Sequence, residues 1–272
     1  MLQAKRLNRS IFNLDYDFDF LIKSYKASLN FYVGIFILNL GYKFKNEMQD
    51  LVAVLKSIQG VKVIDGSIPV KEYSALNLSI SNSDLHRHNL QTADDFEAYI
   101  QHYLAGHNAK VAFDGYNEER NLYKRSTIFN ATAATERNIH IGLDLWIAAG
   151  TPILAALDGI IHSFCFNKGL GNYGPTIILE HQEQGITFYT LYGHLSTQSI
   201  DNIAIGTSVT KGQQIATLGD ASVNGDYAPH LHFQIIKDIQ GNFGDYPGVC
   251  SKKDLDFFLE NCPDPNLLLK LK

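Results

Sequence analysis

The 272-residue sequence has few of the residues that cross-link or interrupt a chain, with only three cysteines and seven prolines. A chain of this length buries enough surface to fold without disulfide bonds. The cysteines, Cys165, Cys250 and Cys262, are too few and too scattered for a disulfide framework or a cysteine-rich zinc site. A pairing of Cys250 with Cys262 stays open, and the odd number leaves at least one free thiol.

An excess of positive charge is also missing. Charged residues make up 19% of the chain, and the net charge at pH 7 is −5. Nucleic-acid binders normally carry a basic footprint, so nucleic acid is not an expected partner. The apolar content of 45%, with 16 Phe and 14 Tyr, excludes disorder, collagen and a coiled coil. The composition therefore predicts a folded globular protein.

Long apolar runs are absent as well. The strongest run, Phe31–Leu40, has ten residues, whereas a helix needs about 20 to cross a bilayer. We therefore predict no transmembrane segment and expect a buried strand or helix here. The basic start of the chain has no apolar region behind it, so it does not resemble a secretory signal and predicts a cytoplasmic location. A signal peptide that starts later, with Lys23 and Lys26 ahead of the run, is the alternative.

The chain divides by composition into four regions. Residues 1–110 form an N-terminal region of unassigned role, and the polar, mixed stretch 111–137 is expected to be a connecting arm. Residues 138–237 contain short β-rich runs separated by glycine, the pattern of an all-β sandwich or barrel. Residues 238–272 are turn-rich and are predicted to wrap around the fold with a short helix near 255–259. The predicted class is α+β, with helices in the N-terminal region and an antiparallel β-sandwich after it.

Two helices are predicted in the N-terminal region from apolar residues at helical spacing. One begins at Met48 and the other covers residues 81–105, and Gly60 and Gly106 are expected to end them. Translation from Met48 is a further hypothesis, in which residues 1–47 are an upstream extension. Mass spectrometry of the native N-terminus tests it.

Two H-x-H pairs stand out among the ten histidines. His230 and His232 lie in a β-type run, where side chains two residues apart share a face. If one imidazole binds a metal, the other reaches the metal's water and can act as a base. His86 and His88 have the same spacing in a polar helix or loop, so the spacing alone is weak evidence for a metal.

A second motif, HIGLD, places His140 and Asp144 four residues apart. Even spacing keeps both on one side of an extended strand, and Gly142 allows the chain to bend toward one point. Two imidazoles and one carboxylate leave an open position on Zn²⁺, which is typical of catalytic rather than structural zinc sites. The alternative is a local hydrogen bond between His140 and Asp144. His194 follows a β-run, after a glycine that lets the backbone turn.

Together these motifs resemble the lysostaphin-type zinc endopeptidases, which cleave peptidoglycan and have a duplicated β-sandwich. The resemblance covers about residues 138–237. It includes HIGLD, GTPILAALDG, GLGNYGPTIILEH, YGHLS and APHLHFQI in the family's order. It implies that one Zn²⁺ per chain is held by three ligands and activated by two further histidines. The implied ligands are His140, Asp144 and His232, and the implied catalytic residues are the general base His230 and its partner His194.

The resemblance implies an endopeptidase whose partner is a peptide or peptidoglycan. Two alternatives stay open, which are a catalytically silent binding module of the same fold and a histidine phosphocarrier on a related sandwich. The family usually acts in the periplasm or outside the cell. Loops 165–175 and 220–229 are expected to form the cleft walls, and Trp146 is expected to pack beneath the site. Asn117 is a candidate blocking ligand by the same resemblance, but we favour its interpretation as a turn residue beside Gly115. The sequence does not indicate the oligomeric state or the scissile bond.

Overall fold

The computed structural model describes residues 51–88, 90–122 and 136–272. The apolar run Phe31–Leu40, the possible start at Met48 and most of the predicted connecting arm therefore lie outside the described residues. Within the described part of the chain, no helix is both long and apolar enough to cross a bilayer.

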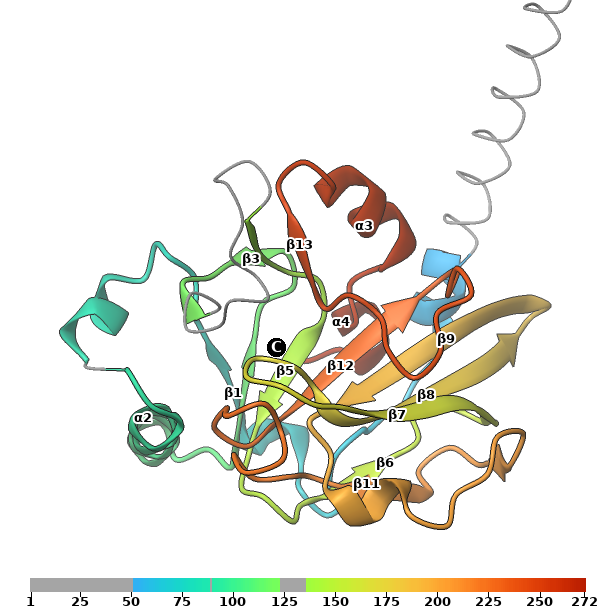
Figure 1. The fold of residues 1–272 in the computed structure, drawn as a ribbon, viewed down its shortest axis with the longest axis horizontal. Coiled ribbons are helices and arrows are strands. Elements are labelled where there is room, and N and C mark those ends of the chain that lie inside the picture. The colour runs from blue at the N-terminus through green and yellow to red at the C-terminus, as the bar shows by residue number, and fades with distance from the viewer. Residues whose placement is uncertain (1–50, 89, 123–135) are drawn as a thin grey trace, which may run out of the picture. The chain divides into compact units, whose positions relative to one another are not determined.

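The centre of the fold is an eight-stranded sheet with the strand order β1-β2-β5-β12-β9-β8-β7-β10 (Figure 1). The pair β1–β2 is parallel and every other neighbouring pair is antiparallel. The strands are β1 (Tyr73–Leu76), β2 (Val111–Asp114), β5 (Leu143–Trp146), β7 (Gly159–Asn167), β8 (Gly174–Glu183), β9 (Ile186–Gly193), β10 (Ser208–Val209) and β12 (His230–Ile236).

Two smaller sheets accompany this sheet. One pairs β6 (Pro152–Leu154) with β11 (Gln214–Thr217), and the other joins β3 (Glu118–Glu119), β4 (Arg137–His140) and β13 (Val249–Ser251).

Alternate side chains of the central strands enter two different cores, as expected for a strand buried on both faces. Ile177 and Leu179 pack in one core with Ile153 of β6, whereas Ile178 packs in the other with Ile139 of β4. This layered, mainly antiparallel architecture confirms the predicted fold class.

Helix α2 (Ala93–His107) follows the short 3₁₀ segments η1 (Val70–Glu72) and η2 (Ser83–Arg87). Thr92 and Asp95 form a reciprocal capping box at its start. The helix expected over 81–105 is thus present in its second half. The expectation that Gly106 ends it is wrong, because the chain leaves the helix at Asn108, which takes the left-handed conformation at φ 49°. Residues 51–57 form the described part of the helix predicted from Met48, and it stops before Gly60.

The first part of the stretch expected to be a connecting arm is built into the sheets. All four residues of β2 are buried, and the strand pairs with both β1 and β5. Residues 111–135 are polar in overall composition, so the short apolar run VAF at their start was not recognised as a strand. Helix α2 contributes Phe96 and Ile100 to a third core, which also contains Ala112 of β2 and Trp146 of β5.

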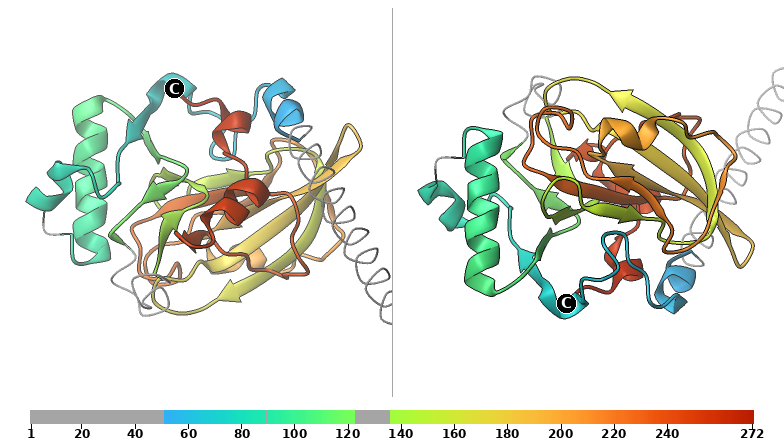
Figure 2. Two further views of the ribbon diagram at one scale, coloured as in Figure 1. Left: turned by 90° about the horizontal axis from the view of Figure 1, so that it is seen from above. Right: turned by 90° about the horizontal axis from the view of Figure 1, so that it is seen from below.

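The C-terminal tail, drawn from orange to red in Figure 2, follows β12. After β13 it forms α3 (Leu255–Asn261) and α4 (Asn266–Leu269), so the predicted short helix is present. Cys250 and Cys262 are buried in one core as free thiols rather than as a disulfide. The remaining 3₁₀ turn, η4 (Thr197–Ile200), follows β9.

Candidate metal centre

His140 and Asp144 lie on two different strands. His140 is the last residue of β4 and Asp144 the second of β5, and the chain bends between them at Gly142. The expectation that even spacing along one strand brings them together is therefore wrong. The bend itself is as predicted, because it turns both side chains toward one point from two sheets.

Strand β12 completes the cluster. His232 lies directly opposite Asp144 in the antiparallel register, and His230 lies opposite Trp146. Gly142 is required here for space, because a Cβ atom at this position would lie 2.5 Å from the His232 ring. The H-x-H pair therefore sits on one face of a buried strand, as predicted.

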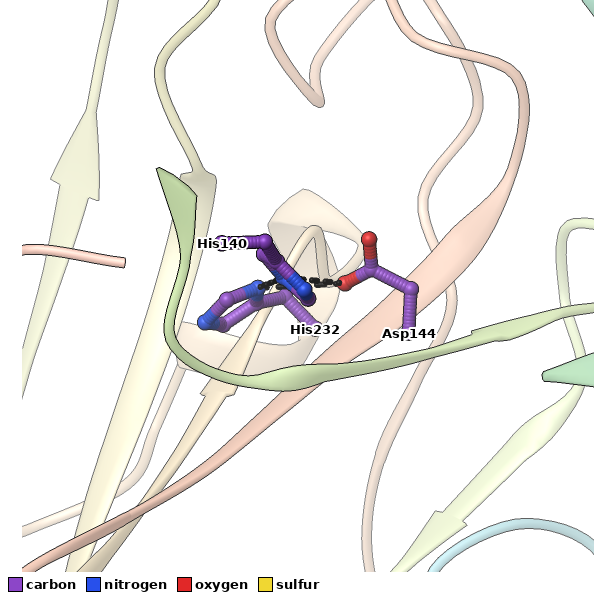
Figure 3. A group of neighbouring side chains, drawn as sticks. All are labelled: His140, Asp144 and His232. Carbon is purple, nitrogen blue, oxygen red and sulfur yellow. Dashed lines mark hydrogen bonds and ion pairs between the residues drawn. The ribbon is translucent and has the colours of Figure 1, made fainter. Parts of the chain in front are cut away.

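Three potential donor atoms converge between these strands (Figure 3). His140 Nε2 lies 3.0 Å from His232 Nδ1, and Asp144 Oδ1 lies 3.2 Å and 3.1 Å from these two atoms. Bonds of 2.0–2.1 Å to a tetrahedral zinc would separate such atoms by about 3.3 Å. The three side chains thus fit a small tetrahedral cation without rearrangement.

The tautomer of His232 strengthens this fit. The Gln234 amide donates from Nε2 to Pro247 O at 3.1 Å, so its Oε1 faces His232 Nε2 at 2.9 Å and accepts the Nε2 proton. Nδ1 of His232 therefore points its lone pair at the Asp144 carboxylate. Two acceptors facing each other in a buried site call for a cation or a proton between them.

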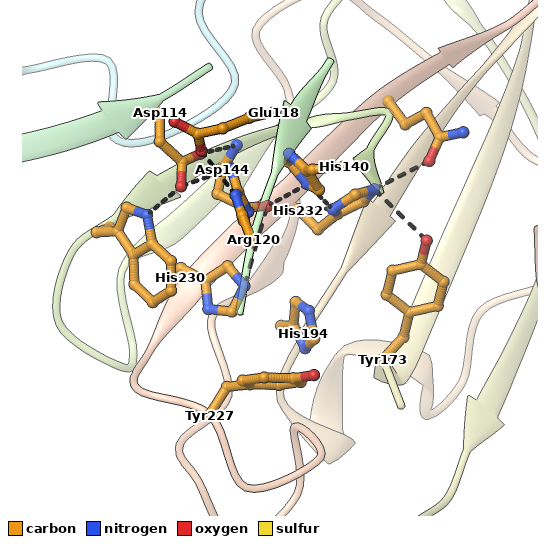
Figure 4. Close-up of polar contacts among 12 residues, drawn as sticks. Asp114, Glu118, Arg120, His140, Asp144, Tyr173, His194, Tyr227, His230 and His232 are labelled. Carbon is orange, nitrogen blue, oxygen red and sulfur yellow. Dashed lines mark hydrogen bonds and ion pairs between the residues drawn. The ribbon is translucent and has the colours of Figure 1, made fainter. Parts of the chain in front are cut away.

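Two further imidazoles border the same site (Figure 4). His230 Nδ1 donates to Ala228 O at 2.8 Å and His194 Nδ1 donates to Asn224 O at 2.9 Å. Both Nε2 atoms are then left as bases, and the two ring centroids are 4.3 Å apart. His230 Nε2 lies 3.9 Å from Asp144 Oδ1, farther than the roughly 3.3 Å that separates two donors on one tetrahedral zinc.

The backbone turn at His194 is not made by Gly193. His194 itself takes the left-handed conformation, with φ 64°, which is uncommon for a residue with a side chain. Gly193 is instead needed for packing, because a Cβ there would lie 2.7 Å from the Tyr173 ring. Such backbone strain is typical of functional sites.

Burial favours the neutral form of three of these histidines, His140, His194 and His230. Burial, assisted by the Arg120 charge, lowers the pKa of His140 to about 3. Burial also lowers the pKa of His230 and holds that of His194 well below its usual range. Burial alone would raise the pKa of Asp144, but the neighbouring imidazoles outweigh it and hold this pKa well below its usual range. Neutral imidazoles and an ionised carboxylate are the protonation states that a metal requires.

Sequence reasoning missed a buried arginine beside the site. Arg120, with no exposed surface, contacts Asp144 Oδ2 at 2.8 Å, Asp114 Oδ2 at 2.7 Å and Glu118 Oε2 at 2.7 Å. Gln234 was also missed. The alternation of β12 could have identified Gln234, because it lies two residues after His232. No local pattern marks Arg120.

The site borders a cleft of about 410 Å³, which is lined by Asp144, His194, His230 and His232. Its walls include Asn172, Tyr173 and Tyr227, within the two predicted loops. A third wall, from Asn242 to Val249, comes from the C-terminal tail and was not anticipated.

Three other candidates can now be placed. Trp146 is fully buried and stacks on His230, with ring centroids 4.0 Å apart, so it packs beneath the site as expected. Asn117 takes φ 59° in the turn before β3, which supports its interpretation as a turn residue. His88 is exposed and contacts Tyr99, away from the cluster.

The sequence of this region matches a known family. Residues 138–243 match the sequence model of Peptidase family M23. This match confirms the resemblance to lysostaphin-type enzymes over this part of the chain. This metallopeptidase family implies a metal ion.

Two curated relatives align with part of the chain. An uncharacterised metalloprotease of Haemophilus influenzae is 32% identical over 35% of this chain and 18% of its own length. The peptidoglycan DD-endopeptidase ShyC of Vibrio cholerae is 36% identical over 36% of this chain and 20% of its own length. The chain thus aligns with about a fifth of these relatives.

Among solved structures, the catalytic domain of lysostaphin from Staphylococcus simulans is 28% identical. The match covers 44% of this chain and 80% of that one, with a TM-score of 0.31.

Proposed function

We propose that the protein is a zinc-dependent endopeptidase that hydrolyses peptide bonds in the stem or cross-bridge peptides of peptidoglycan. The observation that carries the proposal is the convergence of His140 Nε2, Asp144 Oδ1 and His232 Nδ1 within 3.0–3.2 Å of one another beside a cleft that Asp144 and His232 line. Two imidazoles and a carboxylate are a donor set of catalytic zinc sites. The relative ShyC is a peptidoglycan DD-endopeptidase, which supports the substrate class.

In this proposal His140, Asp144 and His232 hold the metal. When bound, Zn²⁺ supplies a Lewis acid that polarises the scissile carbonyl and lowers the pKa of water. His230 takes the proton of the attacking water on Nε2, because Ala228 O engages its Nδ1 proton. Trp146 keeps the His230 ring in this orientation by stacking.

His194 assists from the other side of the cleft. Its Nδ1 proton is engaged by Asn224 O, and its ring lies beside that of His230. It is placed to orient the water or to stabilise the developing oxyanion. Both imidazoles remain neutral near pH 7, because burial lowers their pKa values, so both can accept a proton there.

Incubation with purified peptidoglycan, followed by mass spectrometry of the released peptides, tests the proposal. We expect new amino and carboxyl termini at one type of peptide bond, loss of cleavage with a chelator, and recovery with zinc. Stoichiometric zinc without cleavage would instead favour the binding module. A phosphohistidine without bound zinc would favour the phosphocarrier. Neither result would be compatible with the proposed activity.

A further inference from the structure

The segment before the M23 match runs beside both strands that carry the HIGLD motif. Strand β2 pairs with β5, with Phe113 opposite Leu145, so that Asp114 reaches the level of Asp144. Strand β3 pairs with β4, with Glu118 opposite His140. The turn between β2 and β3 therefore bridges the strand of His140 and the strand of Asp144.

The buried side chain of Arg120 joins the residues of this turn to Asp144. Its guanidinium directs Nη1 to Asp144, Nη2 to Asp114 and Nε to Glu118, at 2.7–2.8 Å. The rigid planar fork of arginine suits such a three-way contact, and a lysine ammonium on a flexible stem does not reproduce it. Because Arg120 engages Oδ2 of Asp144, Oδ1 is left to face the two imidazoles (Figure 4).

Asp114 connects the same cluster to the histidine expected to act as base. Besides Arg120, its carboxylate accepts the Asp144 backbone N–H at 3.2 Å and the Trp146 indole N–H at 3.3 Å. Trp146 in turn stacks on His230. One buried network thus contacts both a candidate ligand and the support of the base.

One guanidinium orients several acidic groups here. Arg120 lies among the carboxyl groups of Asp114, Glu118 and Asp144 and contacts all three. Residues that hold a metal's ligands in this way typically change metal affinity when they are replaced.

We propose that Arg120, supported by Asp114, is a positioning residue of the metal centre, and that residues 111–120 are an integral part of the site although they precede the M23 match. Arg120 fixes the Asp144 carboxylate with one oxygen toward the metal position and restrains its rotation. This inference rests on the proposed metal centre and not on the identity of the substrate.

The test compares zinc affinity by chelator competition in the full chain and its R120K variant. We expect R120K to bind zinc about 10–100-fold more weakly. The visible absorption spectrum of the Co²⁺-loaded protein should also change, because the carboxylate geometry changes. On a cleavable peptide, kcat should fall with KM nearly unchanged, since Arg120 does not line the cleft. The matched control is R87K, because Arg87 forms an exposed ion pair with Asp84 and should leave zinc affinity unchanged.

A second variant covers the case in which R120K does not fold. D114N keeps the size of the side chain and an acceptor for Trp146, but it weakens the anchor of Arg120. We expect about a tenfold loss of zinc affinity. A folded R120K, or failing that a folded D114N, with wild-type zinc affinity and Co²⁺ spectrum would overturn the inference. If the wild-type chain itself bound no metal, the proposed function would fail and this inference would fall with it.

Discussion

The two H-x-H pairs of this chain have the same spacing but lie in different elements, one in a strand and the other at a 3₁₀ segment. His230 and His232 lie on the buried strand β12, where the pleat directs both rings to one face. His86 and His88 lie at the end of the 3₁₀ segment η2, and His88 is exposed beside Tyr99. An H-x-H spacing therefore indicates a metal site only when the pair lies on a strand whose neighbours supply further ligands.

Replacement of His232 should give the largest effect. H232A removes one of three candidate ligands, so we expect zinc and peptide-bond cleavage to be lost together. Metal analysis and a cleavage assay on the same preparation check this. Zinc retained at one per chain in H232A would show that this histidine is not a ligand.

Replacement of His230 should separate turnover from metal binding. H230A keeps all three candidate ligands, so zinc should stay bound while kcat falls by about 10²–10⁴, the range for losing a positioned base. In the wild type, kcat/KM should decline toward acid through a pKa below 6.5, because burial lowers the pKa of His230. H194A should likewise keep zinc bound and lower kcat, because His194 is not one of the three candidate ligands. Zinc released by H230A but retained by H232A would reverse the two assignments.

Replacement of Gln234 should weaken zinc binding to a smaller extent, by releasing the His232 ring. Q234L removes the acceptor that holds the Nε2 proton, so the ring loses its fixed tautomer and orientation. We expect about a 10–100-fold weaker zinc affinity, measured by chelator competition. Q234E, which retains an acceptor, is the matched variant and should bind zinc more tightly than Q234L. Equal affinities for both variants would rule out this role.

His181 tests the effect of burial without a metal. This strand histidine is buried, and burial lowers its pKa to about 4, from 6.5. Between these values the unfolded state binds more protons, so its contribution is complete above pH 6.5 and is lost as pH falls toward 4. The loss amounts to at most about 3 kcal/mol. Unfolding free energies of wild type and H181Q across this range should converge at low pH, and parallel curves would contradict the assignment.

His88 should give the smallest effect. H88A changes an exposed side chain, and such changes usually alter the unfolding free energy by less than about 0.5 kcal/mol. Zinc content and turnover should equal those of the wild type. A loss of zinc in H88A would mean that the spacing, and not the strand, determines metal binding.

The sequence predicted those parts of the site that are encoded within a few residues. HIGLD and HLH could be interpreted because a bend and a strand pleat act locally, and the structure brings His140, Asp144 and His232 together. These two motifs supplied four candidate residues, and YGHLS supplied the fifth, His194. Their mutual distances could not be predicted, because they depend on the pairing of β12 with β5.

The contribution of the N-terminal region could not be predicted in this way. Arg120 acts through three carboxylates, and its place follows from β2 pairing with β5 and β3 pairing with β4. Those pairings depend on a strand only four residues long within a polar stretch. The tail wall of the cleft was missed for the same reason, since Tyr246 and Gly248 reach the site only through the β13–β4 pairing.

The most direct test of the metal centre is a crystal structure of the zinc-loaded chain with anomalous scattering recorded at the zinc edge. We expect one strong peak per chain, 2.0–2.2 Å from His140 Nε2, Asp144 Oδ1 and His232 Nδ1. His194 and His230 should lie farther away and face the open coordination position. A zinc peak bound by His230 in place of His232, or no peak between the three side chains at saturating zinc, would contradict the account.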